Sequence, residues 1–340
     1  MFDNFLIIMY NLFGDLFMKI CVLGSGAYGS ALAKVLCENK NEVVCYSRFE
    51  KEVRELTETR VSPKLPEIKL PLGIKFTSDL ESACKDASFI LVAVPTAFVS
   101  DVLKKAKKYI LDKPICIASK GIEQDSHLFV SEIVENIIGT DNIAVFSGPP
   151  FAIDVANRCP VGLTLACQHK ETTDMIVKAF SNKHFKLRVT GDIIGTEICG
   201  AIKNVIAIAA GILSGMGLPE STQAMFITES IHDIKELIKG LGADGNTITS
   251  FAGFGDLLLT CTSPKSRNFS FGYMIGKGSS QKEIDEYLSS TTVEGFYTLK
   301  SIKGLIEGKN VEMPIINLIE EIIYGEKKPE DLVNFLIKKP

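Results

Sequence analysis

The sequence has little that a nucleic-acid-binding or metal-binding protein requires. Its 37 Lys and Arg residues are outnumbered by 41 Asp and Glu residues, and no basic tail is present that could follow a phosphate backbone. The four histidines, at positions 127, 169, 184 and 232, are far apart and have no ligand spacing with the cysteines. We therefore expect no nucleic-acid partner and no metal site.

The nine cysteines are odd in number and scattered, and most lie in apolar runs such as 19–24 and 198–210. This usage is typical of reduced core cysteines, since disulfides are rare in reducing compartments. We therefore expect a cytoplasmic protein. The chain also lacks the nucleophile elbow of Ser-His-Asp hydrolases.

Residues 1–17 form an apolar N-terminal extension that contains Asp3, Asn4, Asn11 and Asp15 and has no basic n-region. The extension is too short for a stable membrane span. Two explanations stay open, namely a tail added by an upstream start codon and a segment that associates with a membrane surface.

The 340 residues amount to 37.2 kDa, more than one hydrophobic core usually serves, and predict two domains. With 46% apolar and 23% charged residues, the composition is that of a folded globular protein. From Lys19 onward, short β-branched runs alternate with helical stretches, as in a parallel sheet covered by helices. After Gly191 long helical runs follow. We predict a doubly wound α/β domain over 18–191 and an all-helical domain over 192–340.

The expected strands are 19–23, 42–46, 88–94, 115–119, 143–146, 161–166 and 185–189. The expected helices are 28–37, 98–109, 128–138 and 172–180, then 196–213, 222–241, 281–289, 298–307 and 315–324. Gly and Pro cluster at 64–73, 147–150 and 253–268, which we expect to be loops around a site.

The first expected strand leads into residues 24–29, GSGAYG, a G-x-G-x-x-G turn at the start of a helix. Gly24 permits the tight turn, Gly26 lets the backbone approach a pyrophosphate, and Gly29 lets the helix pack against the strand. The start of the helix offers free N–H groups and a positive dipole end to phosphates. In this strand-turn-helix context the motif predicts a Rossmann-type dinucleotide-binding domain.

The end of the second strand distinguishes the two nicotinamide cofactors, because an acid there binds the ribose 2′-hydroxyl and a base accommodates a 2′-phosphate. Residues 44–48 read VCYSR, with no acid at the strand end and Arg48 just beyond it. NADP(H) is favoured, and Glu50 leaves NAD(H) open. The alternative is that Arg48 is only a solvated residue at a helix start.

The expected helix 196–213 is apolar on almost every side but contains Lys203 and Asn204. Burying an ammonium group costs several kcal/mol unless it is paired, and desolvation lowers its pKa towards neutrality. Such a lysine is suited to general acid/base catalysis. A structural lysine paired with Glu197 or Asp256 is the alternative.

A second polar group lies in the segments 253–257 (GFGDL), 260–263 (TCTS) and 266–268 (SRN). Arginine with neighbouring amide and hydroxyl donors is suited to a phosphate or carboxylate group. Lys120, in Ser119-Lys120-Gly121, adds a cation at the sheet edge where ligands of such folds bind. The sequence therefore predicts a small anionic substrate.

Further motifs occur in order along the chain. They are Leu65-Pro66 with Leu70-Pro71, Ser119-Lys120-Gly121-Ile122-Glu123, Ser147-Gly148-Pro149 with Phe151-Ala152, Gly200-Ala201-Ile202-Lys203-Asn204, Gly255-Asp256-Leu257 and Val293-Glu294-Gly295. With these motifs, residues from Met18 to about the last helix resemble the bacterial NAD(P)-dependent glycerol-3-phosphate dehydrogenases.

The resemblance implies reduction of dihydroxyacetone phosphate by NAD(P)H to sn-glycerol 3-phosphate, a precursor for glycerophospholipid synthesis. It implies that Lys203 is the general acid/base and that Lys120 and Asp256 are the other catalytic residues. The substrate-binding residues that it implies are Lys120, Gly148, Pro150, Lys203, Asn204, Asp256, Thr260, Ser266, Arg267 and Asn268. Beside the turn glycines, the cofactor-binding residues are Ala27, Tyr28, Arg48, Lys120, Ala152, Arg267, Thr292 and Glu294.

The sequence departs from the family pattern at a few of these positions. Pro150 stands where the family usually has a small hydroxyl residue, so a side-chain hydrogen bond to substrate is lost there. Ala27 replaces a frequent serine, and Thr292 a common valine. None of these changes removes a residue expected to do chemistry.

Two other functions stay open from the sequence. One is a hydroxy-acid or ketopantoate-type dehydrogenase, since Arg267 alone does not distinguish a carboxylate from a phosphate. The other is a non-catalytic nucleotide-binding or redox-sensing protein, against which Lys203, Asp256 and Arg267 argue. A homodimer is also expected, because helical domains often associate through apolar faces.

Overall fold

The structure is a computed structural model and describes residues 17–309 and 311–338. Residues 1–16 of the N-terminal extension lie outside the described residues. The chain divides into two compact units, one ending at Gly191 and the other starting at Asp192. Two short segments from the first half, 120–129 and 147–149, belong to the second unit. The sequence did not indicate that these two segments belong to the second unit.

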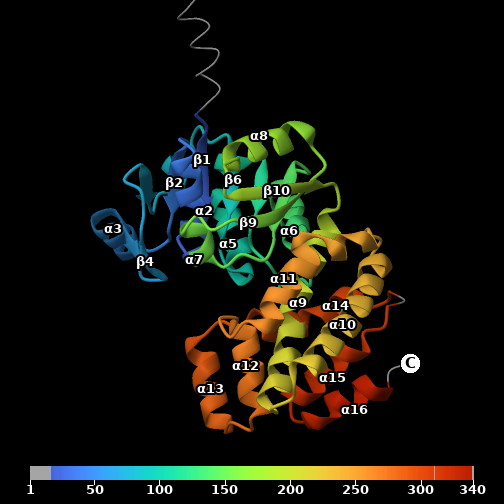
Figure 1. The fold of residues 1–340 in the computed structure, drawn as a ribbon. Coiled ribbons are helices and arrows are strands. Elements are labelled where there is room, and N and C mark those ends of the chain that lie inside the picture. Colours follow the sequence, from blue (N-terminus) through green and yellow to red (C-terminus); the bar gives the residue numbers. More distant parts are fainter. Residues whose placement is uncertain (1–16, 310, 339–340) are drawn as a thin grey trace, which may run out of the picture. The chain divides into compact units, whose positions relative to one another are not determined.

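The first unit is built on an eight-stranded sheet flanked by helices (Figure 1). Its strands are β1 (Lys19–Leu23), β2 (Glu42–Tyr46), β5 (Ile74–Thr77), β6 (Phe89–Val92), β7 (Ile115–Ile117), β8 (Ile143–Ser147), β9 (Val161–Cys167) and β10 (Phe185–Thr190). Their order across the sheet is β10-β9-β8-β7-β6-β1-β2-β5. Pairing is parallel on both sides of β1, where Cys21 lies opposite Val44 and Ile90.

The chain reverses its direction of travel across the sheet at β1. From β1 it goes to β2 on one side and returns to β6 on the other, so the carboxyl ends of β1 and β6 form the switch point of the sheet. Ligands of open α/β sheets bind at such a point. Gly24 follows β1 directly, and this places the glycine-rich turn there.

Helices pack on both faces of the sheet, as expected for a doubly wound fold. The helices of this unit are α2 (Ala27–Glu38), α3 (Glu50–Thr59), α4 (Leu80–Cys84), α5 (Val99–Ile110), α6 (Val130–Ile138), α7 (Ala152–Ala156) and α8 (Lys170–Phe180), with a 3₁₀ turn η1 (Thr96–Phe98). Helix α2 packs against α7 and α8, and α5 packs against α4 and α6. The central strands β6, β7 and β8 are buried throughout, which explains their continuous apolar runs.

The expected loop at 64–73 is partly wrong. Strand β4 (Leu65–Lys69) occupies half of it and pairs antiparallel with β3 (Val61–Ser62). The strand could not be predicted from the sequence, because it contains Pro66 and Glu67, and Pro and Glu are depleted in strands. The sequence also missed α3, in which Leu56 is the buried residue, and the short edge strand β5.

The second unit is all-helical, as the sequence predicted (Figure 1). Its helices are α9 (Ile193–Gly215), α10 (Glu220–Gly240), α11 (Asp256–Thr262), α12 (Arg267–Gly276), α13 (Gln281–Ser290), α14 (Glu294–Ile306), α15 (Pro314–Ile323) and α16 (Glu330–Lys338), with 3₁₀ and π turns η2 (Gly245–Thr249) and η3 (Phe251–Gly255). The expected loop at 253–268 is therefore wrong over α11 and the start of α12. The three consecutive leucines at 257–259 favour a helix, but the flanking Gly, Ser and Thr residues are typical of a loop.

Helix α9 is the central element of the helical unit and is contacted by α10, α11, α12, α14, α15 and α16. Asp192 caps its start, since its side chain accepts a hydrogen bond from the Gly195 N–H at 3.0 Å. In the described part of the chain, α9 is long and apolar enough to cross a membrane, but 83% of its most apolar window is buried inside the structure. Its apolar character is thus that of a core helix.

Helices α9 and α12 pack closely because glycines on each helix face the backbone of the other helix. A Cβ atom at Gly211 or Gly215 of α9 would lie 2.0 Å from the Phe269 carbonyl oxygen or 2.3 Å from that of Tyr273. On α12, a Cβ atom at Gly272 would lie 1.8 Å from the carbonyl oxygen of Ile208 in α9. No other residue fits at these positions, and this contact fixes α12, which begins with Arg267, against α9.

We predict that Gly272→Ala destabilises the protein by about 3 kcal/mol, because the added methyl group overlaps the α9 backbone. In an isolated helix the same change is favourable by about 1 kcal/mol, so the loss must come from packing. Urea unfolding measures it. Gly191→Ala is the control, since a Cβ atom there meets nothing within 4 Å. Equal stability of the two variants would contradict the close contact.

Candidate functional site

One buried carboxylate in the helical unit pairs with two lysines. Asp256, the first residue of α11, receives the Lys203 Nζ of α9 on its Oδ1 at 2.5 Å and the Lys120 Nζ on its Oδ2 at 2.7 Å. Lys120 also donates to the Gly148 carbonyl oxygen at 2.8 Å. The Asp256 side chain is 2% exposed, and those of Lys203 and Lys120 are 11% and 16% exposed. The structure thus brings together the three residues that were expected to be catalytic.

Burial and pairing act in opposite directions on these charges. Burial lowers the pKa of Lys120, while the neighbouring Asp256 carboxylate opposes that change and Lys203 adds to it. Burial would raise the pKa of Asp256, but the charges and hydrogen bonds of the two lysines outweigh it and hold that pKa below its usual value. Asp256 is thus the carboxylate that both lysines share, and Glu294 is a further carboxylate whose charge acts on Lys120.

Pairing of Lys203 with Asp256 was the expectation for a purely structural lysine as well as for a catalytic one. The structure adds a second buried lysine, Lys120, on the same carboxylate. Perturbed charges of this kind are typical of sites that bind anions or transfer protons.

Thr260 fixes the geometry around Asp256. Thr260 lies one helical turn after Asp256. The Thr260 Oγ1 donates to the Asp256 carbonyl oxygen at 2.6 Å and accepts from the Lys203 Nζ at 3.2 Å. The Thr260 hydroxyl is therefore oriented with its proton towards the backbone and a lone pair towards Lys203. In the part of the chain that the structure describes, Asp256 and Thr260 take two of the three Lys203 N–H groups.

Gly200, one turn before Lys203 on α9, faces the stem of Lys120 and the hydroxyl group of Ser147. A Cβ atom at Gly200 would lie 3.6 Å from the Lys120 Cγ and 3.2 Å from the Ser147 Oγ. A methyl group at position 200 would therefore make an ordinary van der Waals contact with Lys120 and a tight contact with Ser147.

The two asparagines expected to bind substrate contact each other. Asn268 Nδ2 donates to Asn204 Oδ1 at 3.0 Å, and Asn268 Oδ1 accepts from the Gly295 N–H at 2.8 Å. Asn204 Nδ2 lies 3.4 Å from Glu294 Oε2. Both asparagines are buried. The motif Val293-Glu294-Gly295 included Gly295 but did not indicate this contact, because a backbone N–H group is present in every residue except proline.

The expected phosphate-binding segment begins α12. Arg267 is exposed and is the first residue of this helix. Ser266 is buried and caps the helix, with its Oγ accepting from the Phe269 N–H at 3.3 Å. The arginine therefore lies at a helix N-terminus, where a positive dipole adds to its charge.

The first unit contains a turn that fits a dinucleotide. Gly24 has a φ of 121°, and a Cβ atom there would lie 2.6 Å from the Ala93 carbonyl oxygen after β6. A Cβ atom at Gly29 would lie 2.2 Å from the Gly24 carbonyl oxygen, whereas at Gly26 it would meet nothing within 4 Å. Among the described residues, no side chain makes a capping hydrogen bond to α2 at Gly26. The turn is thus closed at two glycines and open at the third, at the start of a helix, as a pyrophosphate requires.

The exposed side chain of Arg48 packs on aromatic rings. Its guanidinium lies over two aromatic rings, 4.6 Å from the centroid of Phe49 and 4.7 Å from that of Phe98. Such contacts orient an exposed arginine and add cation–π attraction. Phe98 is 50 residues away in the sequence, and no motif indicated it.

The other expected cofactor and substrate positions are distributed over both units. Ala27 and Tyr28 start α2, Ala152 starts α7, and Pro150 is half-buried before it, all in the first unit. Thr292 is exposed and Glu294 half-buried, both at the start of α14 in the second unit. The structure describes no contact that assigns a role to Thr292.

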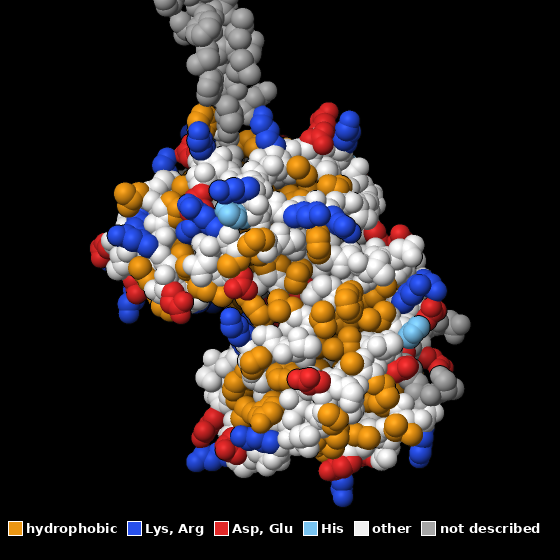
Figure 2. All heavy atoms as spheres, viewed as in Figure 1, with side chains coloured by type: hydrophobic (Ala, Val, Ile, Leu, Met, Phe, Trp, Pro, Cys, Tyr) orange, Lys and Arg blue, Asp and Glu red, His pale blue; other side chains and the backbone are white. Residues whose placement is uncertain are grey.

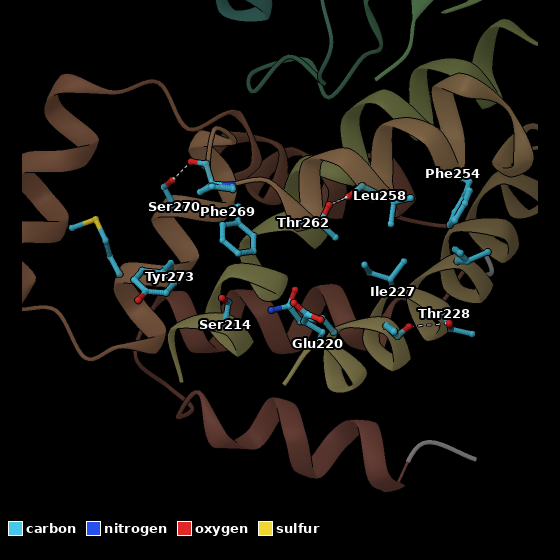
Figure 3. Close-up of a pocket in the computed structure, with 15 residues that line it drawn as sticks. Ser214, Glu220, Ile227, Thr228, Phe254, Leu258, Thr262, Phe269, Ser270 and Tyr273 are labelled. Atoms are coloured by element: carbon cyan, nitrogen blue, oxygen red, sulfur yellow. Dashed lines mark hydrogen bonds between the residues drawn. The ribbon is translucent and has the colours of Figure 1, made fainter. Parts of the chain in front are cut away.

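An apolar groove of about 840 Å³ lies elsewhere in the helical unit, between α10, α11 and α12. Figure 3 shows Ile227 and Thr228 facing Phe254 and Leu258 across it, with Phe269 and Tyr273 at its other end. It contains neither the lysines nor Asp256. Figure 2 shows hydrophobic side chains on the surface of this unit. The groove is therefore separate from the charged cluster.

Comparison with known families identifies the chain. Residues 19–173 match the NAD-dependent glycerol-3-phosphate dehydrogenase N-terminus, and residues 192–334 match the C-terminus of the same family. The chain belongs to the NAD-dependent glycerol-3-phosphate dehydrogenase family. This result confirms the family that the motifs indicated.

Relatives in the family are similar over almost the whole chain. The glycerol-3-phosphate dehydrogenase (NAD(P)+) of Bacillus subtilis strain 168 is 36% identical over 326 residues, which cover 94% of each chain. The Geobacillus thermodenitrificans protein of the same name is 38% identical over 329 residues, 94% of this chain and 95% of the relative.

Solved structures confirm the fold. The Coxiella burnetii glycerol-3-phosphate dehydrogenase superposes with a TM-score of 0.88 at 29% identity and covers 95% of this chain and 100% of that one. The Plasmodium falciparum glycerol-3-phosphate dehydrogenase, at 24% identity and a TM-score of 0.85, covers 98% of both chains and has the same fold. The predicted Rossmann-type sheet followed by an all-helical domain is thus confirmed.

We predict that Asp256→Asn destabilises the protein by about 3–5 kcal/mol at neutral pH, because two buried ammonium groups lose their counter-charge. Without the carboxylate the pKa of Lys120 falls further. The unfolded chain then binds more protons than the folded one above that pKa, so stability of the variant rises with pH. Urea unfolding between about pH 6 and about pH 9 measures this gain.

The matched control for this variant is Glu236→Gln, which removes an exposed carboxylate paired with Lys239 at 2.8 Å. It is expected to change stability little at any pH in that range. A loss in Asp256→Asn that did not depend on pH would contradict the pairing of one carboxylate with two lysines.

Proposed function

We propose that this chain reduces dihydroxyacetone phosphate with NAD(P)H to sn-glycerol 3-phosphate, reversibly, and so supplies glycerophospholipid synthesis. The observation that supports it most is the cluster of Lys203, Asp256 and Lys120 in a chain of this family. A ketone that gains a hydride develops negative charge on its oxygen, and a positively charged buried cluster stabilises that charge.

Lys203 is the general acid in this proposal. Two of its three N–H groups are held by Asp256 Oδ1 and Thr260 Oγ1, at 2.5 and 3.2 Å. The remaining N–H donates to the C2 oxygen of the ketone, and the proton moves to that oxygen as C2 is reduced. In the reverse direction the neutral amine accepts the proton from the alcohol. The bound reduced nicotinamide supplies the hydride.

Lys120 and Asp256 support this proton transfer electrostatically. Asp256 orients both ammonium groups, and Lys120 keeps the cluster positive while its burial lowers its own pKa. In this proposal Lys120 and Asn204 also bind the substrate.

The phosphate of the substrate binds at the start of α12. Arg267 supplies charge and a bidentate donor pair, and the first N–H groups of the helix supply further donors. The backbone of Gly148 and the ring of Pro150 line the substrate without a side-chain hydroxyl group. Binding the phosphate away from C2 contributes binding energy that holds the reacting carbon in position.

NADP(H) is the favoured cofactor and NAD(H) a possible one. The turn residues Gly24, Gly26, Ala27, Tyr28 and Gly29 bind the pyrophosphate through the backbone. Arg48, held by its two aromatic neighbours, binds a 2′-phosphate. The remaining expected contacts are Lys120, Ala152, Arg267, Thr292 and Glu294.

The chain works in the cytoplasm as a homodimer without membrane insertion. All nine cysteines are free thiols, which fits a reducing compartment. Exposed Phe254, Leu258 and Tyr273, each 41–43% accessible, line the apolar groove and favour burial against a second copy. Light scattering is expected to give about twice 37.2 kDa, and a monomer mass would contradict the dimer.

We predict that dihydroxyacetone phosphate, but not unphosphorylated dihydroxyacetone, supports rapid oxidation of NADPH by the purified protein. The absorbance of the reduced nicotinamide measures the rate, and NADH in parallel gives the cofactor preference that Arg48 sets. Oxidation with 2-keto acids instead would favour a hydroxy-acid or ketopantoate-type dehydrogenase. NADPH binding without turnover of any of these substrates would favour a sensor and contradict the proposal.

We predict that Lys203→Ala lowers turnover by about two to four orders of magnitude, the usual effect of removing a general acid/base. The comparison is with Lys239→Ala, which removes an exposed lysine of α10 and is expected to leave turnover unchanged. Initial rates at saturating dihydroxyacetone phosphate measure both. Near-normal turnover by Lys203→Ala would rule out its proposed role.

A further inference from the structure

Two cysteines of the first unit lie next to each other in its interior. Cys21 is in the middle of β1, and Cys84 is the last residue of α4, which packs against β1. Both side chains are fully buried, and their Sγ atoms are 3.9 Å apart, within reach of a hydrogen bond between the two sulfurs. Because an S–S bond is about 2.05 Å long, the two sulfurs are only about 2 Å from bonding distance.

The two sulfurs differ in acidity. The hydrogen bond with Cys21 lowers the pKa of the Cys84 thiol, burial opposes that effect, and the charges of Lys113 and Lys19 add to it, so the pKa lies below its usual value. For Cys21 the same hydrogen bond and burial both raise the pKa. The thiolate is the nucleophilic form of cysteine. Cys84 is therefore the reactive sulfur, and Cys21 is the neighbour that keeps its proton.

The chain reaches the surface directly after Cys84, since Lys85 is exposed. Two lysine side chains hold this turn: the Lys19 Nζ donates to the Lys85 carbonyl oxygen, and the Lys113 Nζ donates to the Ala87 carbonyl oxygen at 3.2 Å. Helix α4 is only five residues long. Short segments at the surface open locally at a small cost in free energy, so a small uncharged oxidant can reach Cys84 through this turn.

We propose that Cys21 and Cys84 form a reversible oxidation site, at which hydrogen peroxide converts the two thiols into a disulfide between β1 and α4. The Cys84 thiolate attacks the peroxide, an S–O bond forms as the O–O bond breaks, and the departing hydroxide takes up a proton to become water. The Cys21 sulfur then attacks the Cys84 sulfenic acid. The S–S bond forms as the S–O bond breaks, and a second water leaves with the Cys21 proton. The two thiols lose two electrons, and the peroxide is reduced to water.

The second thiol limits how far Cys84 is oxidised. A sulfenic acid without a neighbouring thiol is oxidised further to a sulfinic acid, which thiol reductants do not reverse, whereas a disulfide is reduced back to two thiols. A sulfinate would place a charge in the core beside β1, the strand that leads into the turn at Gly24. The site requires neither substrate nor cofactor and is independent of the proposed dehydrogenase activity.

Peptide mapping of the full chain tests the site, in a Cys159→Ser background that removes an exposed thiol. The protein is treated with hydrogen peroxide, alkylated and digested with trypsin, which releases Cys21 in residues 20–34 and Cys84 in residues 76–85, each with a single cysteine. We expect these two peptides to be linked, and dithiothreitol to separate them. Recovery of both peptides alkylated and unlinked, or linkage of either one to other cysteines instead, would overturn the proposal.

A serine at position 21 separates the two steps, because Cys21→Ser keeps a hydrogen-bond donor beside Cys84 but has no sulfur. In this variant Cys84 is expected to gain oxygen atoms that dithiothreitol does not remove. Cys45→Ser is the matched control, since Cys45 is a fully buried cysteine of the neighbouring strand β2 and burial raises its pKa to about 12. It is expected to leave the link intact. A Cys84 that stays reduced in Cys21→Ser, or a link that is lost equally in both variants, would contradict the proposed site.

Discussion

The buried carboxylate of Asp256 is the interaction on which the charged part of the helical unit depends. Two ammonium groups are buried beside it, and each would cost several kcal/mol without a counter-charge. Asp256 joins three parts of the chain that are distant in sequence, namely α9 through Lys203, α11 through its own position and the segment 120–129 through Lys120. Because that segment belongs to the helical unit, the ion cluster is complete within one unit.

Close backbone packing gives this cluster its geometry. Two glycines on α9, Gly211 and Gly215, let α12 approach it where a larger side chain would not fit. Gly295 likewise lets α14 approach the backbone of α9 at Asn204. The Gly295 N–H donates to Asn268 Oδ1 and so orients that side chain. Polar side chains of the site are thus fixed by packing and by backbone groups on rigid helices, which preorganises them for a small charged substrate.

Much of the fold follows from the sequence, because each strand from β1 to β10 that is buried on both faces reads as a continuous apolar run. Lys203 could be singled out in the same way, as a charge inside an apolar helix. What the sequence could not supply are pairings over long separations: Lys120 lies 136 residues before Asp256, and Phe98 lies 50 after Arg48. Strand β4 and helix α11 were not predicted, because Pro66 and the residues flanking Leu257 are typical of loops.

The most direct test of the central interaction is an NMR titration of lysine ¹³Cε resonances, with Lys120 assigned through Lys120→Arg. The account predicts that Lys120 titrates below the exposed lysines, because burial lowers its pKa. It also predicts that in Asp256→Asn the Lys120 pKa falls further, since the carboxylate that opposes the effect of burial is gone. A Lys120 that titrates with the exposed lysines, or whose pKa is unchanged in Asp256→Asn, would contradict the account.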